Sequence, residues 1–183
     1  YNSREQVWLD ECITLANHRG QGEFLVHLGD LISGGQPAPP SYYTGIARTL
    51  GRAEMPTFIV PGDNEWNDQE DPDHAWQVWS RIFMHHHRRW DHAGSLKKMY
   101  PKSNGVRHQP RRAENFAFVR KNVLIVGVNL TSGRVHDPDE WNRRLLANAD
   151  WIRQNYQRYS DQVRAAVILA QAAPMPPFTD LFR

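Results

Sequence analysis

Hydrophobic and polar positions in the first third of the chain predict alternating helices and strands. A helical period over residues 4–19 is followed by a short apolar run over residues 23–28, which is typical of a buried strand. A second helix is expected over residues 42–50 and a second strand over residues 57–60. Both strands end in the dipeptide Gly-Asp. This order predicts a parallel βαβ unit whose functional loops lie on one edge of a sheet.

The rest of the chain continues the alternation. The expected elements are a helix over residues 73–83, two paired strands over residues 115–119 and 122–128, a long amphipathic helix that begins at Asp137 or Asp139, and a last buried strand over residues 165–170. Residues 85–112 show no clear period, and the chain contains no internal repeat. We therefore expect residues 1–183 to form a single α/β domain with an insert at about residues 85–112.

Length and composition agree with one folded domain. The chain has 183 residues, of which 40% are hydrophobic, and this is enough to build a substantial core. No apolar run reaches the eighteen or so residues that a membrane span requires, so no membrane span is expected. Cys12 is the single cysteine, which excludes an internal disulfide and a cysteine-based zinc site.

Positive charge is concentrated in the predicted insert. Residues 85–112 contain eight Lys or Arg and one acid, out of chain totals of 22 and 20, so this segment carries about +7 and the remainder about −5. Such a segment would attract anionic substrates if it lay beside the active site. The run from His85 to His87 also lies here, but three adjacent residues on a regular element cannot all face one metal ion.

Polar residues stand at the carboxyl ends of four predicted strands. They are Asp30, Asp63 with Asn64, Asn129 and Gln171. The carboxyl ends of strands in open α/β sheets are where loops converge and ligands bind. Carboxylate and amide oxygens are suitable ligands for divalent cations, and two neighbouring cations can hold a phosphoryl group and activate water. The pattern therefore predicts a metal site at this edge of the sheet.

Two motifs in this part of the chain resemble a known family. HLGDLISGG, which contains Asp30, and VPGDNEW, which contains Asp63, resemble the second and third signature blocks of the calcineurin-like metallophosphoesterases. The resemblance implies a layered α/β fold with a β-sheet core flanked by helices. It also implies a hydrolase that uses two divalent metal ions (Mn, Fe, Zn, Mg or Ca) to cleave a small phosphorylated substrate, as a phosphatase or a phosphodiesterase.

The resemblance assigns roles to the residues of both motifs. Asp30 matches the aspartate that bridges both metals, and Asp63 stands at the position of a ligand to one of them. Asn64 stands where the family has the histidine that assists catalysis, so it is expected to orient substrate phosphate. Glu65 occupies the acidic position that follows, and is a second candidate for substrate binding.

Two later strand ends complete the expected site. The GDNEW spelling resembles a subgroup in which a later strand ends in Gln-Ala, and AVILAQAAP places Gln171 at the position of a metal-binding histidine. An amide oxygen is a weaker ligand for a transition metal than an imidazole. Asn129, in GVNLTSG, either caps the chain internally or reaches the site to bind substrate, and the sequence leaves both interpretations open.

The family's opening aspartate block and closing histidine block do not occur between Tyr1 and Arg183. Tyr1 would be the last residue of the opening block, so we expect this chain by itself to bind metal weakly and to turn over slowly. Two other functions stay open. One is a non-catalytic domain of the same fold, and the other is a nucleic-acid-binding module that uses residues 85–112, with Trp90 and Tyr100 available for stacking.

Overall fold

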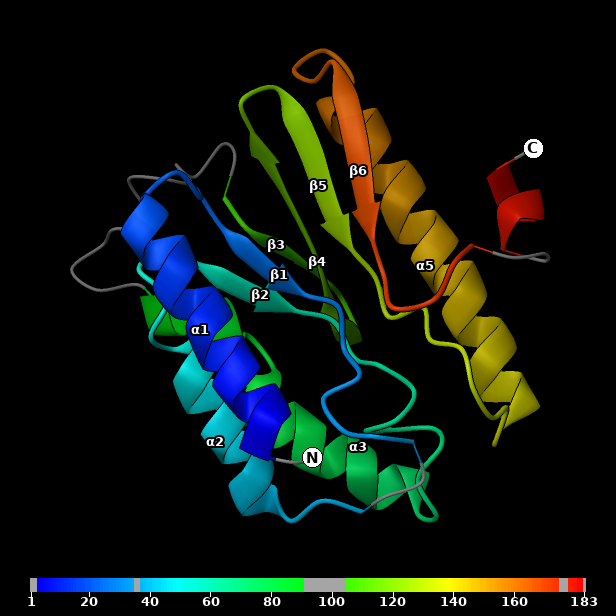
Figure 1. Cartoon of the computed structure of the whole chain (residues 1–183). Helices are drawn as coiled ribbons and strands as arrows, with labels where there is room; N and C mark the ends of the chain where they lie inside the picture. The colour runs from blue at the N-terminus through cyan, green and yellow to red at the C-terminus, as the bar shows by residue number, and fades with distance from the viewer. Residues whose placement is uncertain (1–2, 35–36, 91–104, 175–177, 183) are drawn as a thin grey trace.

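The computed structural model describes residues 3–34, 37–90, 105–174 and 178–182 (Figure 1). Its elements, in chain order, are α1 (Ser3–Arg19), β1 (Leu25–His27), α2 (Pro40–Leu50), β2 (Thr57–Ile59), α3 (Pro72–Phe83), the 3-10 helix η1 (His86–Trp90), β3 (Arg107–Gln109), β4 (Arg112–Arg120), β5 (Val123–Gly127), α5 (Pro138–Tyr159), β6 (Ala165–Leu169) and the 3-10 helix η3 (Thr179–Phe182). The predicted mixed α/β character of the chain is therefore confirmed.

The strands form two small sheets. β1 and β2 pair in parallel through the α2 crossover, which confirms the predicted βαβ unit. The second sheet has the order β3-β4-β5-β6, in which β4 and β5 are antiparallel and β5 and β6 are parallel. The β4–β5 hairpin turns at Lys121 and Asn122, whose φ angles of 47° and 62° are those that suit a tight right-twisted hairpin.

Alternating side chains on the strands join the two sheets to each other and to the helices. Phe58 on β2 stacks on Phe116 and Phe118 of β4, with ring centroids 4.8 and 4.7 Å away, so the sheets pack face to face. Ile59 points the other way, into the cluster formed with α1, α2 and α3. Ala117 on β4 likewise faces α5. The layers are therefore three helices, a sheet, a second sheet and a long helix (Figure 1).

Local capping sets where two of the helices begin. Asp137 accepts hydrogen bonds from the backbone N–H groups of Asp139 and Glu140, at 2.9 and 3.0 Å, and is the N-cap of α5. This decides between the two predicted starting residues in favour of Asp137. Asp71 caps α3 in the same way through the N–H of His74, at 2.9 Å.

The structure differs from the sequence-based expectation for two strands: β6 is less buried than expected, and β3 was not predicted. The last strand, β6, was expected to be buried, but Val167 and Ile168 are 43% and 47% exposed. Within the described part of the chain β6 pairs only with β5, so it is an edge strand with incomplete cover on both faces. β3 was not predicted because its sequence, Arg-His-Gln, has no apolar residue. Its pairing with β4 holds it in the sheet.

No helix in the described ranges is long and apolar enough to cross a membrane.

Candidate functional site

The loops that follow β1 and β2 meet at two glycines. A Cβ atom on Gly29 would collide with the backbone of Gly62, and a Cβ atom on Gly62 would collide with the backbone nitrogen of Asp30. Gly29 also has a φ of +87°, which favours glycine. Glycine is therefore required at both positions for the loops to approach this closely.

Asp30 itself has an unusual backbone conformation. Its φ is 56°, in the left-handed region that few residues other than glycine adopt. Such a conformation costs free energy, and it persists because the surrounding contacts impose it. The result is a carboxylate that projects from the β1 loop toward the β2 loop.

The carboxylates of Asp30 and Asp63 lie together, as the parallel strand arrangement predicts. Both accept a hydrogen bond from the same atom, Nε2 of Gln171, at 3.1 Å for Asp30 and 3.3 Å for Asp63. Their oxygens are thus within two hydrogen-bond lengths of each other. Partial burial and the neighbouring Asp63 carboxylate raise the pKa of Asp30, because each disfavours its charged form.

A serine that the sequence interpretation missed completes this cluster. The Ser132 hydroxyl donates a short hydrogen bond to Asp63, and the Ser132 backbone N–H donates to Oε1 of Gln171 at 2.9 Å. Gln171 therefore presents its amide nitrogen, and not the oxygen that a metal requires, to the carboxylates. A half-turn of the amide would reverse this and would give up the bond from the Ser132 N–H.

Asn64 and Glu65 lie beside the carboxylates but make different contacts. Asn64 is partly buried and donates to the Ile32 carbonyl at 2.9 Å. Glu65 is only 1% exposed, and its two oxygens accept from the N–H groups of Gly62 and Leu31, at 2.7 and 2.9 Å. Burial raises the pKa of Glu65 to about 7. Glu65 thus ties the β1 and β2 loops together, and this internal role accounts for both of its oxygens.

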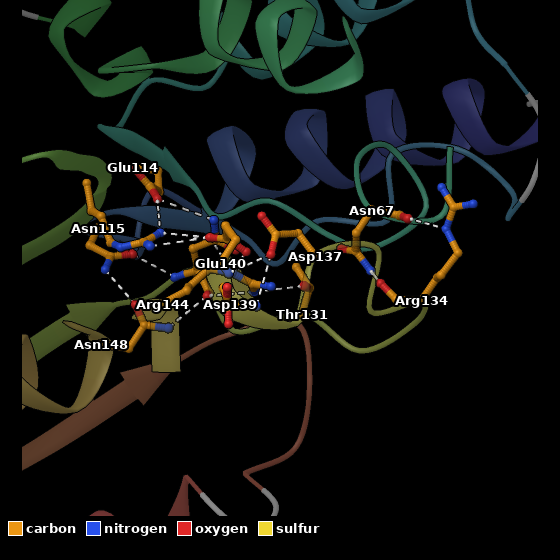
Figure 2. Close-up of polar contacts among 12 residues, drawn as sticks. Asn67, Glu114, Asn115, Thr131, Arg134, Asp137, Asp139, Glu140, Arg144 and Asn148 are labelled. Atoms are coloured by element: carbon orange, nitrogen blue, oxygen red, sulfur yellow. Dashed lines mark hydrogen bonds and ion pairs between the residues drawn. The ribbon is translucent and has the colours of Figure 1, made fainter. Parts of the chain in front are cut away.

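Asn129 is buried and belongs to a polar network on the α5 side of the second sheet. Figure 2 shows other members of this network, Glu114, Asn115 and Asn148. Its backbone N–H donates to Asn115 at 2.6 Å, its carbonyl accepts from Asn148 at 2.7 Å, and its side-chain amide donates to Glu114 at 3.3 Å. Of the two open interpretations, these contacts match the internal one. None of its hydrogen bonds within the described part of the chain reaches Asp30 or Asp63.

The oxygen atoms at the strand ends suit a hard divalent cation. Among the residues that the structure describes, no three His, Cys, Asp or Glu side chains form a group that could hold a metal ion. The site consists of the Asp30 and Asp63 carboxylates, which lie close together although their negative charges repel each other. The Ser132 hydroxyl and the Gln171 side-chain amide lie next to them. This donor set fits the carboxylate part of a metal centre, in which Asp30 and Asp63 would be the ligands.

Histidine rings of the described part of the basic insert pack against one another. The rings of His85 and His87 lie with centroids 4.3 and 5.0 Å from that of His108. Burial lowers the pKa of His87 to about 3 and of His108 to about 4, so both rings are neutral at pH 7. Tyr100 and the other residues from 91 to 104, which the nucleic-acid interpretation uses, lie outside the described residues.

Several arginines of the insert are also engaged within the fold. Arg107 donates to Asn155 at 2.8 Å, and Arg112 pairs with Glu140 at 3.2 Å. Guanidinium groups that pair within the fold are less available to bind an external anion.

No protein-family model and no curated protein sequence matches this chain.

Proposed function

We propose that this chain is a metal-dependent phosphoester hydrolase of the calcineurin-like type. The observation that carries the proposal is the convergence of Asp30 and Asp63 on one nitrogen atom at the ends of two parallel strands. The order of layers, helices on a sheet, a second sheet and a helix, supports the same family. So does the glycine contact that lets the two loops approach.

The residues of this chain would then have distinct tasks. Asp30 and Asp63 would hold divalent cations, which when bound supply the positive charge that activates water and neutralises a phosphoryl group. Ser132 fixes the orientation of the Asp63 carboxylate through its hydroxyl. Glu65 joins the two loops through its hydrogen bonds to Leu31 and Gly62. Asn64 lies beside Asp30, where it would orient substrate phosphate.

A non-catalytic domain of the same fold is the second candidate. The observation in its favour is that Gln171 Nε2 and the Ser132 hydroxyl already satisfy the two carboxylates with hydrogen-bond donors. A protein that no longer binds metal would keep such an arrangement, because it lowers the repulsion between the carboxylates.

Hydrolysis of 4-nitrophenyl phosphate separates the two candidates. We expect release of 4-nitrophenol to depend on added Mn²⁺ and to return to the uncatalysed rate when the protein is treated with EDTA, because the carboxylates cannot activate water without a cation. Re-addition of Mn²⁺ in excess over EDTA should restore the rate. No hydrolysis with any of Mn²⁺, Zn²⁺, Mg²⁺, Fe²⁺ or Ca²⁺ would favour the non-catalytic candidate.

A further inference from the structure

A pocket of about 350 Å³ opens directly beside the carboxylate pair. Asp30, Ser33 and Asn64 form its polar side. Its other walls come from α1 and from the β1 loop, and these walls are mainly apolar: Trp8, Leu9, Leu31 and Ile32. The pocket thus joins the candidate reaction centre to an apolar surface.

Trp8 is the most exposed large hydrophobic residue of this wall. Its side chain is 66% exposed, whereas Leu9, Leu31 and Ile32 belong to the buried core. An indole ring in this position offers a flat face for an aromatic group to stack on. The core residues beside it provide a rigid apolar base that does not have to be ordered on binding.

His27 adds a neutral polar group to the same pocket. Its Nδ1 accepts a hydrogen bond from the Gly29 N–H at 3.2 Å, which leaves the hydrogen on Nε2. Burial lowers the pKa of His27 to about 4, so the ring carries no charge at pH 7. The pocket therefore has its one negative charge, Asp30, at the edge that faces Asp63, and no ionic group among the remaining residues that line it.

We propose that this pocket receives the alcohol part of the substrate and selects phosphomonoesters of small aromatic alcohols, with Trp8 as the residue that determines this specificity. The inference rests on the proposed function for the location of the phosphate. A volume of about 350 Å³ is at the lower end of small-molecule sites and accommodates one ring better than a polymer. In the reaction, water bonds to phosphorus through its oxygen, the ester P–O bond breaks, and the released phenol keeps one proton of that water.

Kinetics of a Trp8→Ala variant test the specificity. With phenyl phosphate we expect kcat/KM to fall about tenfold, because a stacked aromatic contact is lost, and with methyl phosphate to change less than about twofold. Trp8→Phe should retain most of the activity on phenyl phosphate. Leu15→Ala is the matched control, since Leu15 is 48% exposed on the same helix and does not line the pocket. Equal losses on both substrates, or no loss on phenyl phosphate, would overturn the specificity role of Trp8.

Binding of a non-hydrolysable pair separates this inference from the proposed function. We expect phenylphosphonate to bind more tightly than methylphosphonate, measured by NMR chemical-shift perturbation, and the preference to disappear in Trp8→Ala. If this preference is found without any hydrolysis, the aromatic pocket stands and the hydrolase assignment fails. If hydrolysis is found without the preference, the pocket inference is wrong and the hydrolase assignment stands.

Discussion

Replacing Asp30 by Asn should lower the Mn²⁺-dependent kcat/KM for 4-nitrophenyl phosphate by at least about a hundredfold without destabilising the protein. Asn has the size of Asp and can still bond to Gln171, but it has no charge to hold a cation. The carboxylate of Asp30 is kept near that of Asp63, and its pKa is raised by burial and by this neighbour. Removing its charge relieves the repulsion, so the midpoint of thermal unfolding should stay the same or rise.

This opposite response of activity and stability distinguishes a functional carboxylate from a structural one. Asp150→Asn is the matched control, because Asp150 is an exposed carboxylate that pairs with Arg153 on the surface of α5. It should leave both activity and thermal unfolding unchanged. An Asp30→Asn protein that keeps its Mn²⁺-dependent activity would remove Asp30 from the proposed mechanism.

Mild acid should unfold this protein through its buried histidines. Burial lowers the pKa of His86 to about 4, of His87 to about 3 and of His108 to about 4, from an ordinary value of 6.5. Between pH 6.5 and about 4 the unfolded chain therefore binds protons that the folded chain does not. The stability that neutral imidazoles provide is complete above pH 6.5 and is lost as the pH falls toward 4, by roughly 3 kcal/mol for His86 alone.

Glu65 acts in the opposite direction over part of this range. Burial raises its pKa to about 7 from 4.5, so the folded chain takes up its proton first and gains stability as the pH falls from 7 to 4.5. Asp30 and Glu114, whose pKa values burial also raises, act in the same direction as Glu65, whereas His27, whose pKa burial lowers to about 4, acts with the other histidines. We expect the four histidines to outweigh the carboxyls, so that acid is destabilising. Urea unfolding at pH 7.5, 6.5, 5.5 and 4.5 measures it.

A pair of variants assigns the acid effect to the cluster. His86→Gln should flatten the decrease in unfolding free energy with falling pH, since His86 is 2% exposed and packs beside Phe83. His74→Gln, an exposed position on α3, should not change that pH dependence. A pH dependence that is the same in both variants and in the natural sequence would show that His86 is not responsible.

The order of helices and strands followed from local patterns in the sequence, and the exposure of β6 did not. Periodicity identified the β1–α2–β2 unit, the β4–β5 hairpin and α5 because each buries one regular face. An apolar strand such as β6 has the same pattern whether it is central or at an edge, since exposure depends on which neighbours pair with it.

The pairing of Asp30 with Asp63 was predictable for a general reason. The carboxyl ends of adjacent parallel strands meet at one edge, so the residues that follow them converge. The sequence did not identify Ser132 as part of the site, and it did not predict the internal hydrogen bonds of Glu65. Ser132 contacts Asp63 because of the conformation of the loop after β5, which the local sequence pattern does not predict. The Glu65 side chain points inward because the buried N–H groups of Leu31 and Gly62 need a hydrogen-bond acceptor.

Isothermal titration with Mn²⁺ tests most directly whether Asp30 and Asp63 share a cation. We predict measurable Mn²⁺ binding to the natural sequence. In Asp30→Asn and in Asp63→Asn the affinity should be at least about tenfold weaker. The double variant should bind only slightly more weakly than either single variant, because the two residues act on one centre. Affinities that are unchanged in either single variant, or losses that add fully in the double variant, would contradict a shared metal centre.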